Sequence, residues 1–240
     1  MNAAPILEPM VRKLELWGPL EEEDRAALLA LPYTLREIPQ QGYIVRDGDR
    51  PTHSCALLRG YAFRQKIVAD GERQILAVQI PGDLVDLQNS LLPKADHSVQ
   101  ALTRVEVAYI PREPIVALAF ERPAIGKLLW FDTLVDGSIA REWITNIGRR
   151  DAYTRIAHLL CEFALRLEKA GIGERDRYEL PMTQEQIADA TGLTAVHVNR
   201  TLRTMDESGF LTRDKRSVVI HDWARLAQAG DFSSGYLHFD

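Results

Sequence analysis

Three polar residues near the C-terminus, Asn199, Arg200 and Arg203, recur at a spacing that places them along one side of an α-helix. The guanidinium of an arginine can bind guanine through two parallel hydrogen bonds, and the amide of an asparagine can bind adenine in the same way. An exposed helix face with these side chains is therefore suited to read base edges in the major groove of DNA. Such a helix needs a second element that holds it against the duplex.

The preceding residues have the pattern of that second element. Thr183 and Gln186 have the spacing of a capping box, which predicts a helix over 184–190. Gly192 predicts a tight turn, because glycine adopts positive φ at little steric cost. Thr194 is the predicted cap of the next helix, which we expect to stop before the next glycine. The two helices form a helix-turn-helix, whose expected core is Ile187, Ala188, Leu193, Val198, Leu202 and Met205.

Two strand-like runs follow, at 210–212 and 218–220, and they enclose the basic segment Arg213-Asp214-Lys215-Arg216. This arrangement is typical of a hairpin wing with a basic tip, which contacts the phosphate backbone. The alternative is a helical hairpin with a solvated arginine side. The residues predicted to contact DNA are Thr183, Gln184, Thr194, Val196, His197, Asn199, Arg200, Arg203, Arg213, Lys215 and Arg216.

A long helical pattern runs from Pro123 to about Arg149. Its apolar residues recur at steps of three or four, which fits a coiled-coil-like seam between two copies of the chain. The alternative is that the same stripe packs on the chain's own sheet. The predicted dimer seam consists of Leu128, Phe131, Val135, Ile139, Trp143 and Ile147.

The region before this helix, from about Thr34 to Ala119, contains short apolar runs separated by turn signals such as Asp70-Gly71. Several short strands at this spacing predict a sandwich or barrel. We place the boundary between this β-rich part and the helical C-terminal part near Arg150.

Composition limits the classes of function. The net charge of −5 means that a nucleic-acid site is a local basic patch on an acidic body, and the apolar share of 46% is enough for packed cores. Cys55 and Cys161 lack metal-ligand spacing, so we expect two reduced core cysteines in a reducing compartment. The N-terminal residues lack a signal-peptide pattern, and no run approaches the ~20 apolar residues of a membrane span. We expect a soluble, cytoplasmic protein without a membrane partner.

No G-x-S-x-G, phosphate-binding Gly-Lys-Ser/Thr, H-E-x-x-H or Cys/His metal pattern occurs in the sequence. Asp83 and Asp86 form a carboxylate pair only in isolation, since the sequence PGDLVD more simply forms a turn. We therefore expect neither an enzyme nor a metal site. The rival from another class is a ligand-binding module without DNA activity.

The segment TQEQIADATGLTAVHVNRTLRTMDESGFL resembles the helix-turn-helix of the Crp/Fnr family of transcription regulators, the relatives of the cyclic-AMP receptor protein. The motifs PGD and RRDAYTRIAHLL fall in the expected order, so the resemblance covers most of the chain. It implies an α+β fold with three parts: a cyclic-nucleotide-binding-like β-roll (a double-stranded β-helix or jelly roll) over 1–121, a long dimerisation helix over 122–150 and a winged helix-turn-helix over 151–240. It also implies a homodimer on pseudo-palindromic double-stranded DNA, with RNA polymerase as a further partner.

Residue by residue, the resemblance gives Arg200 a base-reading role. The glutamate common in the family is Val196 here, so its hydrogen bond to cytosine is lost and an apolar contact with a thymine methyl group can replace it.

The β-roll departs further from the family pattern. The Gly-Glu and Arg-Ser pairs that hold a cyclic nucleotide correspond to Val85-Asp86 and His97-Ser98. Because the phosphate-binding arginine is lost, we do not expect cyclic-AMP binding. The effector pocket predicted by the resemblance consists of Asp83, Val85, Asp86, His97, Ser98 and Arg141.

The sequence also limits which other cofactor or effector the chain can bind. The resemblance implies that an oxygen-sensing member would hold an iron–sulfur cluster with an N-terminal cysteine cluster, and residues 1–35 contain no cysteine, so we exclude that cluster. Haem is not excluded, since His53, Cys55 and His97 are candidate axial ligands. The remaining alternatives are a different small-molecule effector or no ligand at all.

Overall fold

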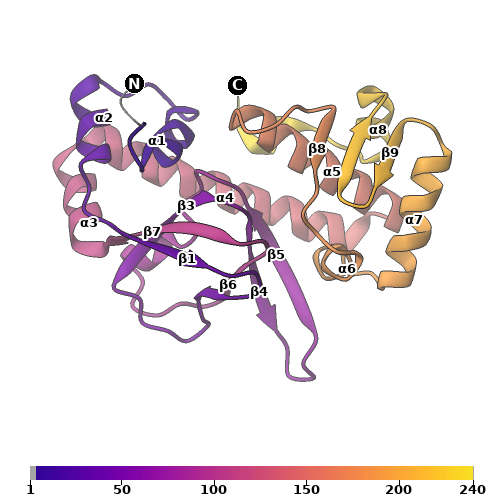
Figure 1. Ribbon diagram of the computed structural model, residues 1–240, viewed down its shortest axis with the longest axis horizontal. Helices are drawn as coiled ribbons and strands as arrows, with labels where there is room; N and C mark the ends of the chain where they lie inside the picture. Colours follow the sequence, from indigo (N-terminus) through magenta and orange to yellow (C-terminus); the bar gives the residue numbers. More distant parts are fainter. Residues whose placement is uncertain (1–3, 240) are drawn as a thin grey trace. The chain divides into compact units, whose positions relative to one another are not determined.

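The computed structural model describes residues 4–239, which divide into two compact units (Figure 1). The first unit contains the chain up to Lys66 together with Ala77–Gly137, and the second contains Ile67–Leu76 together with Ser138–Asp240. The division falls inside the long helix rather than at one of its ends.

The β-roll consists of two antiparallel sheets, and all of it except the hairpin residues Ile67–Leu76 belongs to the first unit. The strand order in one sheet is β1–β7–β3, and in the other it is β2–β6–β4–β5. Cys55 on β3 and Thr34 on β1 both pair with Tyr109 of the central strand β7. The strands are β1 Thr34–Ile38, β2 Tyr43–Val45, β3 His53–Arg59, β4 Ala62–Ile67, β5 Arg73–Gln79, β6 Ser98–Ala101 and β7 Val105–Pro111. The β-rich N-terminal region predicted from the turn signals is confirmed.

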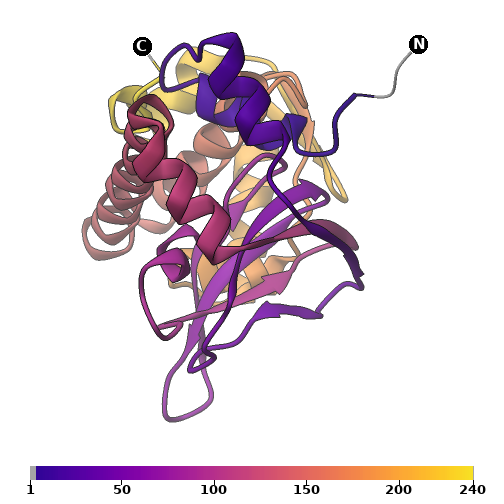
Figure 2. The same ribbon diagram turned by 90° about the vertical axis from the view of Figure 1, so that its left-hand side faces the viewer.

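Helices gather at one end of these sheets (Figures 1 and 2). They are α1 Glu8–Glu15, α2 Glu22–Leu29 and α3 Arg112–Glu121, and a short 3₁₀ turn, η1, covers Leu87–Ser90. Leu7, Leu14 and Leu28 pack in one core cluster with Ala56 and Ile110 of the strands. Helix α2 has Glu22, Glu23 and Asp24 in its first turn, where negative charge suits the positive end of the helix dipole.

Helix α4, Pro123–Arg149, has two apolar sides. The predicted dimer seam lies on the inner one: Val135 and Trp143 are buried, and Phe131 is half-buried. The remaining seam residues, Leu128, Ile139 and Ile147, are likewise buried or half-buried within the chain's own units. The seam prediction is corrected on this point, because the periodic stripe packs on its own chain. Trp130, Leu134 and Ile144 are exposed instead.

The second unit is helical with a small sheet. Its helices are α5 Ala152–Lys169, α6 Gln184–Thr191, α7 Ala195–Glu207 and α8 Trp223–Ala229, followed by the 3₁₀ turn η2, Ser234–Leu237. The strands β8 Arg177–Glu179, β9 Leu211–Asp214 and β10 Ser217–Ile220 form a sheet in the order β8–β10–β9. The hairpin of β9 and β10 is the predicted wing, and β8 is an unpredicted third strand. Among residues 4–239, no helix is long and apolar enough to cross a membrane.

Candidate nucleic-acid interface

The first helix of the motif begins with both halves of a capping box. The backbone N–H of Gln186 donates to Thr183 Oγ1 over 3.2 Å, and the backbone N–H of Thr183 donates to Gln186 Oε1 over 2.8 Å. At the other end, Gly192 takes a left-handed conformation with φ of 65°. A Cβ there would lie 3.2 Å from Ile147 Cγ2, so both the turn and the packing favour glycine. These features fix where α6 ends and α7 begins.

Helix α7 starts at its own cap, where the backbone N–H of His197 donates to Thr194 Oγ1 over 3.2 Å. Five of the six expected core residues, Ile187, Ala188, Val198, Leu202 and Met205, are buried, and Leu193 is half-buried. The opposite side of α7 is open to solvent. Val196 is 82% exposed, and Asn199, Arg200 and Arg203 are also exposed.

The polar side chains of the open side make few bonds. Asn199 Nδ2 donates to Gln184 Oε1 over 3.1 Å, which joins two of the predicted DNA contacts. Arg203 Nε donates to Glu207 Oε1 over 2.9 Å in an exposed pair on the same helix. Such exposed pairs contribute little to stability, so these side chains are free to exchange partners.

Arg200 and His197 line a hollow of about 370 Å³ beside the start of α5. Sequence reasoning missed the other walls of this hollow, which include Ala152, Tyr153 and Thr204. One further wall residue, Asp151, has a local signal, because an aspartate just before a helical pattern is a preferred cap, and its side chain accepts from the Thr154 N–H. The approach of α5 to α7 depends on tertiary packing.

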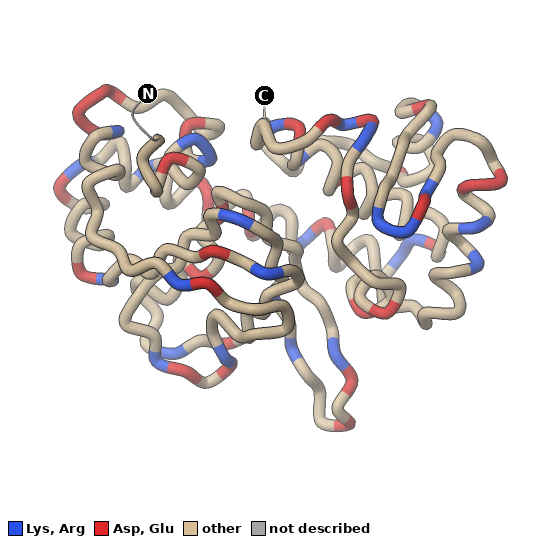
Figure 3. The backbone as a smooth tube through the Cα atoms, viewed as in Figure 1, with Lys and Arg blue, Asp and Glu red and all other residues tan. Residues whose placement is uncertain are grey.

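The wing turns at Lys215, whose φ is 53°, and Lys215 and Arg216 are exposed. Basic residues mark both this turn and α7 (Figure 3). Arg213 differs from its prediction, because it is half-buried and burial lowers its pKa. Its Nε has no hydrogen-bond partner among the described residues. We therefore leave Arg213 out of the exposed basic surface.

Comparisons with known proteins follow the same division of the chain. Residues 35–122 match the cyclic nucleotide-binding domain family, and residues 154–229 match the Crp-like helix-turn-helix domain family. The chain is 30% identical over 222 residues to the transcriptional activator protein FnrL of Cereibacter sphaeroides, and the alignment covers 90% of this chain and 88% of FnrL. The chain belongs to the Crp/Fnr family of transcription regulators.

Two further relatives agree with this assignment. The nitrogen fixation regulation protein FixK of Bradyrhizobium diazoefficiens is 28% identical over 183 residues, which cover 76% of each chain. The solved structure of FixK2 from Bradyrhizobium japonicum matches with a TM-score of 0.78 at 24% identity, and it covers 85% of this chain and 100% of that one. The match to FixK2 shows the shared fold.

In this Crp/Fnr regulator the residues predicted to form an effector pocket bond mainly to the protein itself. Asp83 Oδ1 accepts from Lys13 Nζ over 2.5 Å, and His97 Nδ1 is bonded to Asp96 over 2.7 Å. Ser98 Oγ accepts from the backbone N–H of Asp47. The remaining residues are Val85 and Asp86, which are buried, and Arg141, which lies in the second unit and donates to Ser138 Oγ.

The buried Arg64 contacts both the backbone of Val85 and helix α4. Arg64 is buried; its Nε donates to Val85 O over 3.1 Å, and its guanidinium pairs with Asp136 of α4. Burial together with the charge of Arg64 lowers the pKa of His97. The guanidinium of Arg64 thus already has a carboxylate partner, and its Nε is bonded to the backbone of one of the residues predicted to form the effector pocket.

Proposed function

We propose that this Crp/Fnr regulator binds pseudo-palindromic DNA sites as a homodimer and reads each half-site with the exposed side of α7. The observation that supports this most directly is the division of α7 into two sides. Val198, Leu202 and Met205 are buried, while Asn199 and Arg200 lie in solvent on a helix that is capped and held by α6. An Arg/Asn side of this kind fits the major groove, where guanine and adenine present paired hydrogen-bonding groups.

Each exposed residue has a distinct expected role. Arg200 reads guanine, and Val196 contacts a thymine methyl group. Asn199 reads adenine with its side-chain amide, whose Nδ2 donates to Gln184 Oε1 in the absence of DNA. Thr183 and the first turn of α6 contact a phosphate, which helix N-termini favour. Lys215 and Arg216 of the wing contact the backbone and position the protein without reading sequence.

The homodimer is proposed to form through the exposed side of α4. Trp130 and Ile144 are 69% and 71% exposed and lie two heptads apart with Gly137 between them. Leu134 is 54% exposed and lies one heptad before Arg141. This repeat of about 3.5 residues places the exposed apolar side chains on one narrow stripe, as in a left-handed coiled coil. Solvent exposure of so many large apolar groups on one helix favours a second copy as their partner.

A selection of bound fragments from random duplex DNA tests the proposal. We expect an enriched inverted repeat whose half-sites have centres about 10–10.5 base pairs, or a multiple of that, apart. The matched control is the Asn199→Ala/Arg200→Ala double variant, which should bind without enriching that motif. A motif without twofold symmetry would contradict the homodimer, and an unchanged motif from the double variant would contradict the reading role of α7.

Because FnrL is named a transcriptional activator, we further infer that this regulator acts in the cytoplasm on RNA polymerase. Transcription in vitro from a promoter that carries the selected site measures this directly. Added regulator should change the transcript yield from that promoter and leave a promoter with a scrambled site unchanged.

A further inference from the structure

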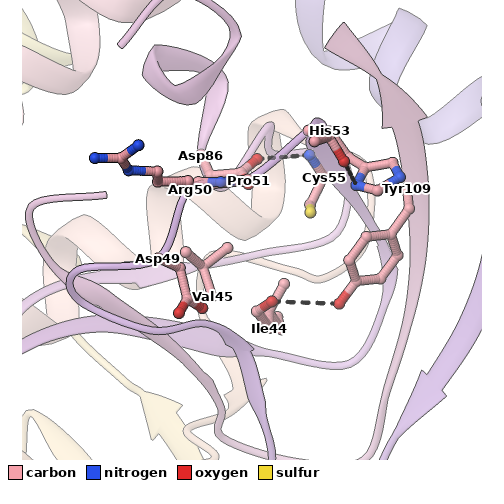
Figure 4. Close-up of a pocket in the computed structure, with 10 residues that line it drawn as sticks. Ile44, Val45, Asp49, Arg50, Pro51, His53, Cys55, Asp86 and Tyr109 are labelled. Carbon is pink, nitrogen blue, oxygen red and sulfur yellow. Dashed lines mark hydrogen bonds between the residues drawn. The ribbon is translucent and has the colours of Figure 1, made fainter. Parts of the chain in front are cut away.

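Charged side chains outside the DNA-reading side gather both in the β-roll and on the exposed side of α4. In the β-roll they line a cavity of about 330 Å³ (Figure 4). Its lining contains Asp49 and Asp86 together with Arg50 and His53, so groups of both signs are present. The Asp86 carboxylate already accepts from the backbone N–H of Cys55 over 2.5 Å. A polar ligand there would have to displace existing partners, so the group on α4 is the better candidate for a new site.

The group on α4 consists of Ser138, Arg141 and His238, which we call the Arg141 cluster. Arg141 Nη2 donates to Ser138 Oγ over 2.7 Å, and Ser138 Oγ is hydrogen-bonded to His238 Nε2 over 3.3 Å. All three residues belong to the second unit, and Arg141 and His238 are exposed. Within residues 4–239 no carboxylate pairs with Arg141, so most of its N–H donors remain available to a ligand.

The backbone fixes the position of His238. Its φ is 52°, in the left-handed region that residues with a Cβ rarely adopt. The preceding residue, Leu237, is completely buried and anchors the end of η2. Backbone strain persists only where the surrounding structure maintains it, and it is common at ligand sites. The strained turn holds the imidazole of His238 beside Ser138 of α4.

The carboxylates of α4 do not balance this cluster. Glu142 Oε1 lies 2.7 Å from Arg150 Nη1, and Asp136 pairs with Arg64. The third carboxylate of the helix, Asp132, has a side chain that is only 14% exposed. The exposed stripe of α4 therefore carries positive charge without a negative partner of its own.

The Arg141 cluster lies on the stripe proposed as the dimer interface, so this inference rests on the proposed homodimer. The DNA-reading unit follows the C-terminal end of α4 in each copy, so two copies on one duplex must have their α4 helices parallel. In a parallel pair with twofold symmetry, each position of the stripe meets the same position of the second copy. Arg141 then faces the Arg141 of the second copy, one heptad after the Leu134 pair. Gly137, one turn earlier, has no side chain that could fill the space beside them.

Two facing arginines repel each other in a seam of low dielectric constant unless an anion lies between them. The second copy cannot supply that anion from α4, because no Asp or Glu occupies a core or flanking position of the heptad repeat between Lys127 and Gly148. A tetrahedral oxyanion has a suitable shape and charge. Each guanidinium can bind two of its oxygens through parallel, charge-assisted hydrogen bonds.

We propose that the α4 seam of the homodimer binds one phosphate-type oxyanion between its two Arg141 clusters, and that this anion strengthens the dimer. The two Arg141 side chains bind the anion from opposite sides. Each Ser138 hydroxyl accepts from Arg141 and donates its own hydrogen to an oxygen of the anion, and His238 flanks the site. Because the complete site exists only where two copies meet, the anion shifts the equilibrium towards the dimer by mass action.

Inorganic phosphate is the probe, and it replaces chloride at constant ionic strength. Sedimentation equilibrium of the full-length protein without DNA measures the dimer dissociation constant, which phosphate should lower at least about tenfold. Calorimetric titration should give one bound phosphate for every two chains. The matched control is Arg149→Leu, which removes an exposed arginine of the same helix outside the stripe and should keep the full phosphate response.

Arg141→Leu distinguishes an anion site from an arginine that only supports the interface. Leucine at this position removes the facing charges and adds apolar contact between the helices. In phosphate-free buffer the variant should therefore form a dimer at least about tenfold tighter than that of the unchanged protein. Its dissociation constant should no longer respond to phosphate. Because the expected change is a gain in dimer affinity, a misfolded variant cannot imitate it.

The outcomes separate the anion site from the homodimer on which it rests. A monomeric unchanged protein, or a dimeric Leu134→Asp variant, would overturn the α4 interface and the anion site with it. A dimer that Leu134→Asp dissociates but phosphate does not strengthen would overturn the anion site alone. The same holds for a phosphate response that persists in full in Arg141→Leu or His238→Ala, for a weaker Arg141→Leu dimer, and for one phosphate bound per chain.

Discussion

The exposed side of α7 and the interior of the β-roll use polar residues in opposite ways. On α7, Asn199 and Arg203 lie in solvent and make single surface bonds. In the β-roll, Arg64, Asp83 and Asp86 are buried and bonded to groups of their own unit. A surface side chain can change partners at little cost, whereas a buried one must keep its partner or exchange it for an equivalent one.

This difference indicates how each unit meets its ligand. The proposed DNA-reading side of α7 is positioned by caps and an apolar core that do not use Val196, Asn199 or Arg200. A polar ligand of Arg64 or Asp86 has to displace a partner that the buried side chain already has. Asp86 faces Cys55, Arg64 and Asn89, and the guanidinium of Arg64 is paired with Asp136.

The sharpest test of the two sides of α4 uses neighbouring residues. Val135 is 4% exposed and Leu134 is 54% exposed. Val135→Asp should lower the free energy of unfolding by about 4 kcal/mol, because it buries an unpaired charge. Leu134→Asp should keep cooperative unfolding and convert the dimer to a monomer in sedimentation velocity. Urea denaturation of both variants measures the first effect, and a dimeric Leu134→Asp protein would refute the proposed interface.

The next test concerns the buried carboxyl of the β-roll. Burial raises the pKa of Asp86 to about 6, so the folded state holds this proton more tightly than the unfolded chain does. Its contribution to stability is therefore present at low pH and is lost as pH rises between about 4 and 6, by up to roughly 3 kcal/mol. Asp86→Asn removes this dependence.

Thermal unfolding of the Asp86→Asn protein and the unchanged protein from pH 4 to pH 8 measures the difference. The melting temperature of the variant should rise relative to that of the unchanged protein as pH rises. This difference between the two melting temperatures should level off above pH 7. A constant difference across this range would show that Asp86 does not titrate with a raised pKa.

On the DNA-reading side, Arg200→Ala should cost about 1–3 kcal/mol on the selected site and relax the preference at one base position. Lys215→Ala, on the wing, should weaken binding to all sequences alike and reduce the salt slope by about 1. Fluorescence anisotropy with matched and mismatched duplexes at several salt concentrations separates the two effects. Uniform weakening by Arg200→Ala would make Arg200 a phosphate contact.

The smallest expected effect is at the capping box. Thr183→Ala removes the acceptor of the Gln186 N–H and should cost about 1 kcal/mol of stability, with Thr183→Ser as the conservative control. Chemical denaturation monitored by circular dichroism is the measurement. A loss several times larger would indicate that Thr183 supports more than the first turn of α6.

Much of the second unit could be predicted because its signals are local. Thr183, Gln186, Gly192 and Thr194 act on residues three or four positions away, and the observed helices begin where these residues predict. Strand β8 was missed because three residues with one buried side chain, Tyr178, carry almost no periodic signal.

The dimer seam and the effector pocket were harder to predict from the sequence, for a different reason. Helix α4 carries two apolar stripes, and the sequence alone does not show which one faces the chain's own core. The exposed Trp130 and the buried Val135 both satisfy a helical repeat. Likewise, nothing near Asp86 in the sequence shows that its partner is the backbone of Cys55, which comes from another strand. Burial of this kind is decided by contacts between distant segments.

The exposed position of Trp130 has a spectroscopic consequence. Of the four tryptophans, Trp143 is buried with its indole N–H donating to Glu162, and Trp17 and Trp223 are half-buried. Trp130 alone among them is exposed, so its emission should lie furthest to the red and be the most accessible to iodide. A chain in which the other three are replaced by Phe would thus carry an intrinsic optical reporter. Its blue shift with protein concentration would record the covering of α4 without any added label.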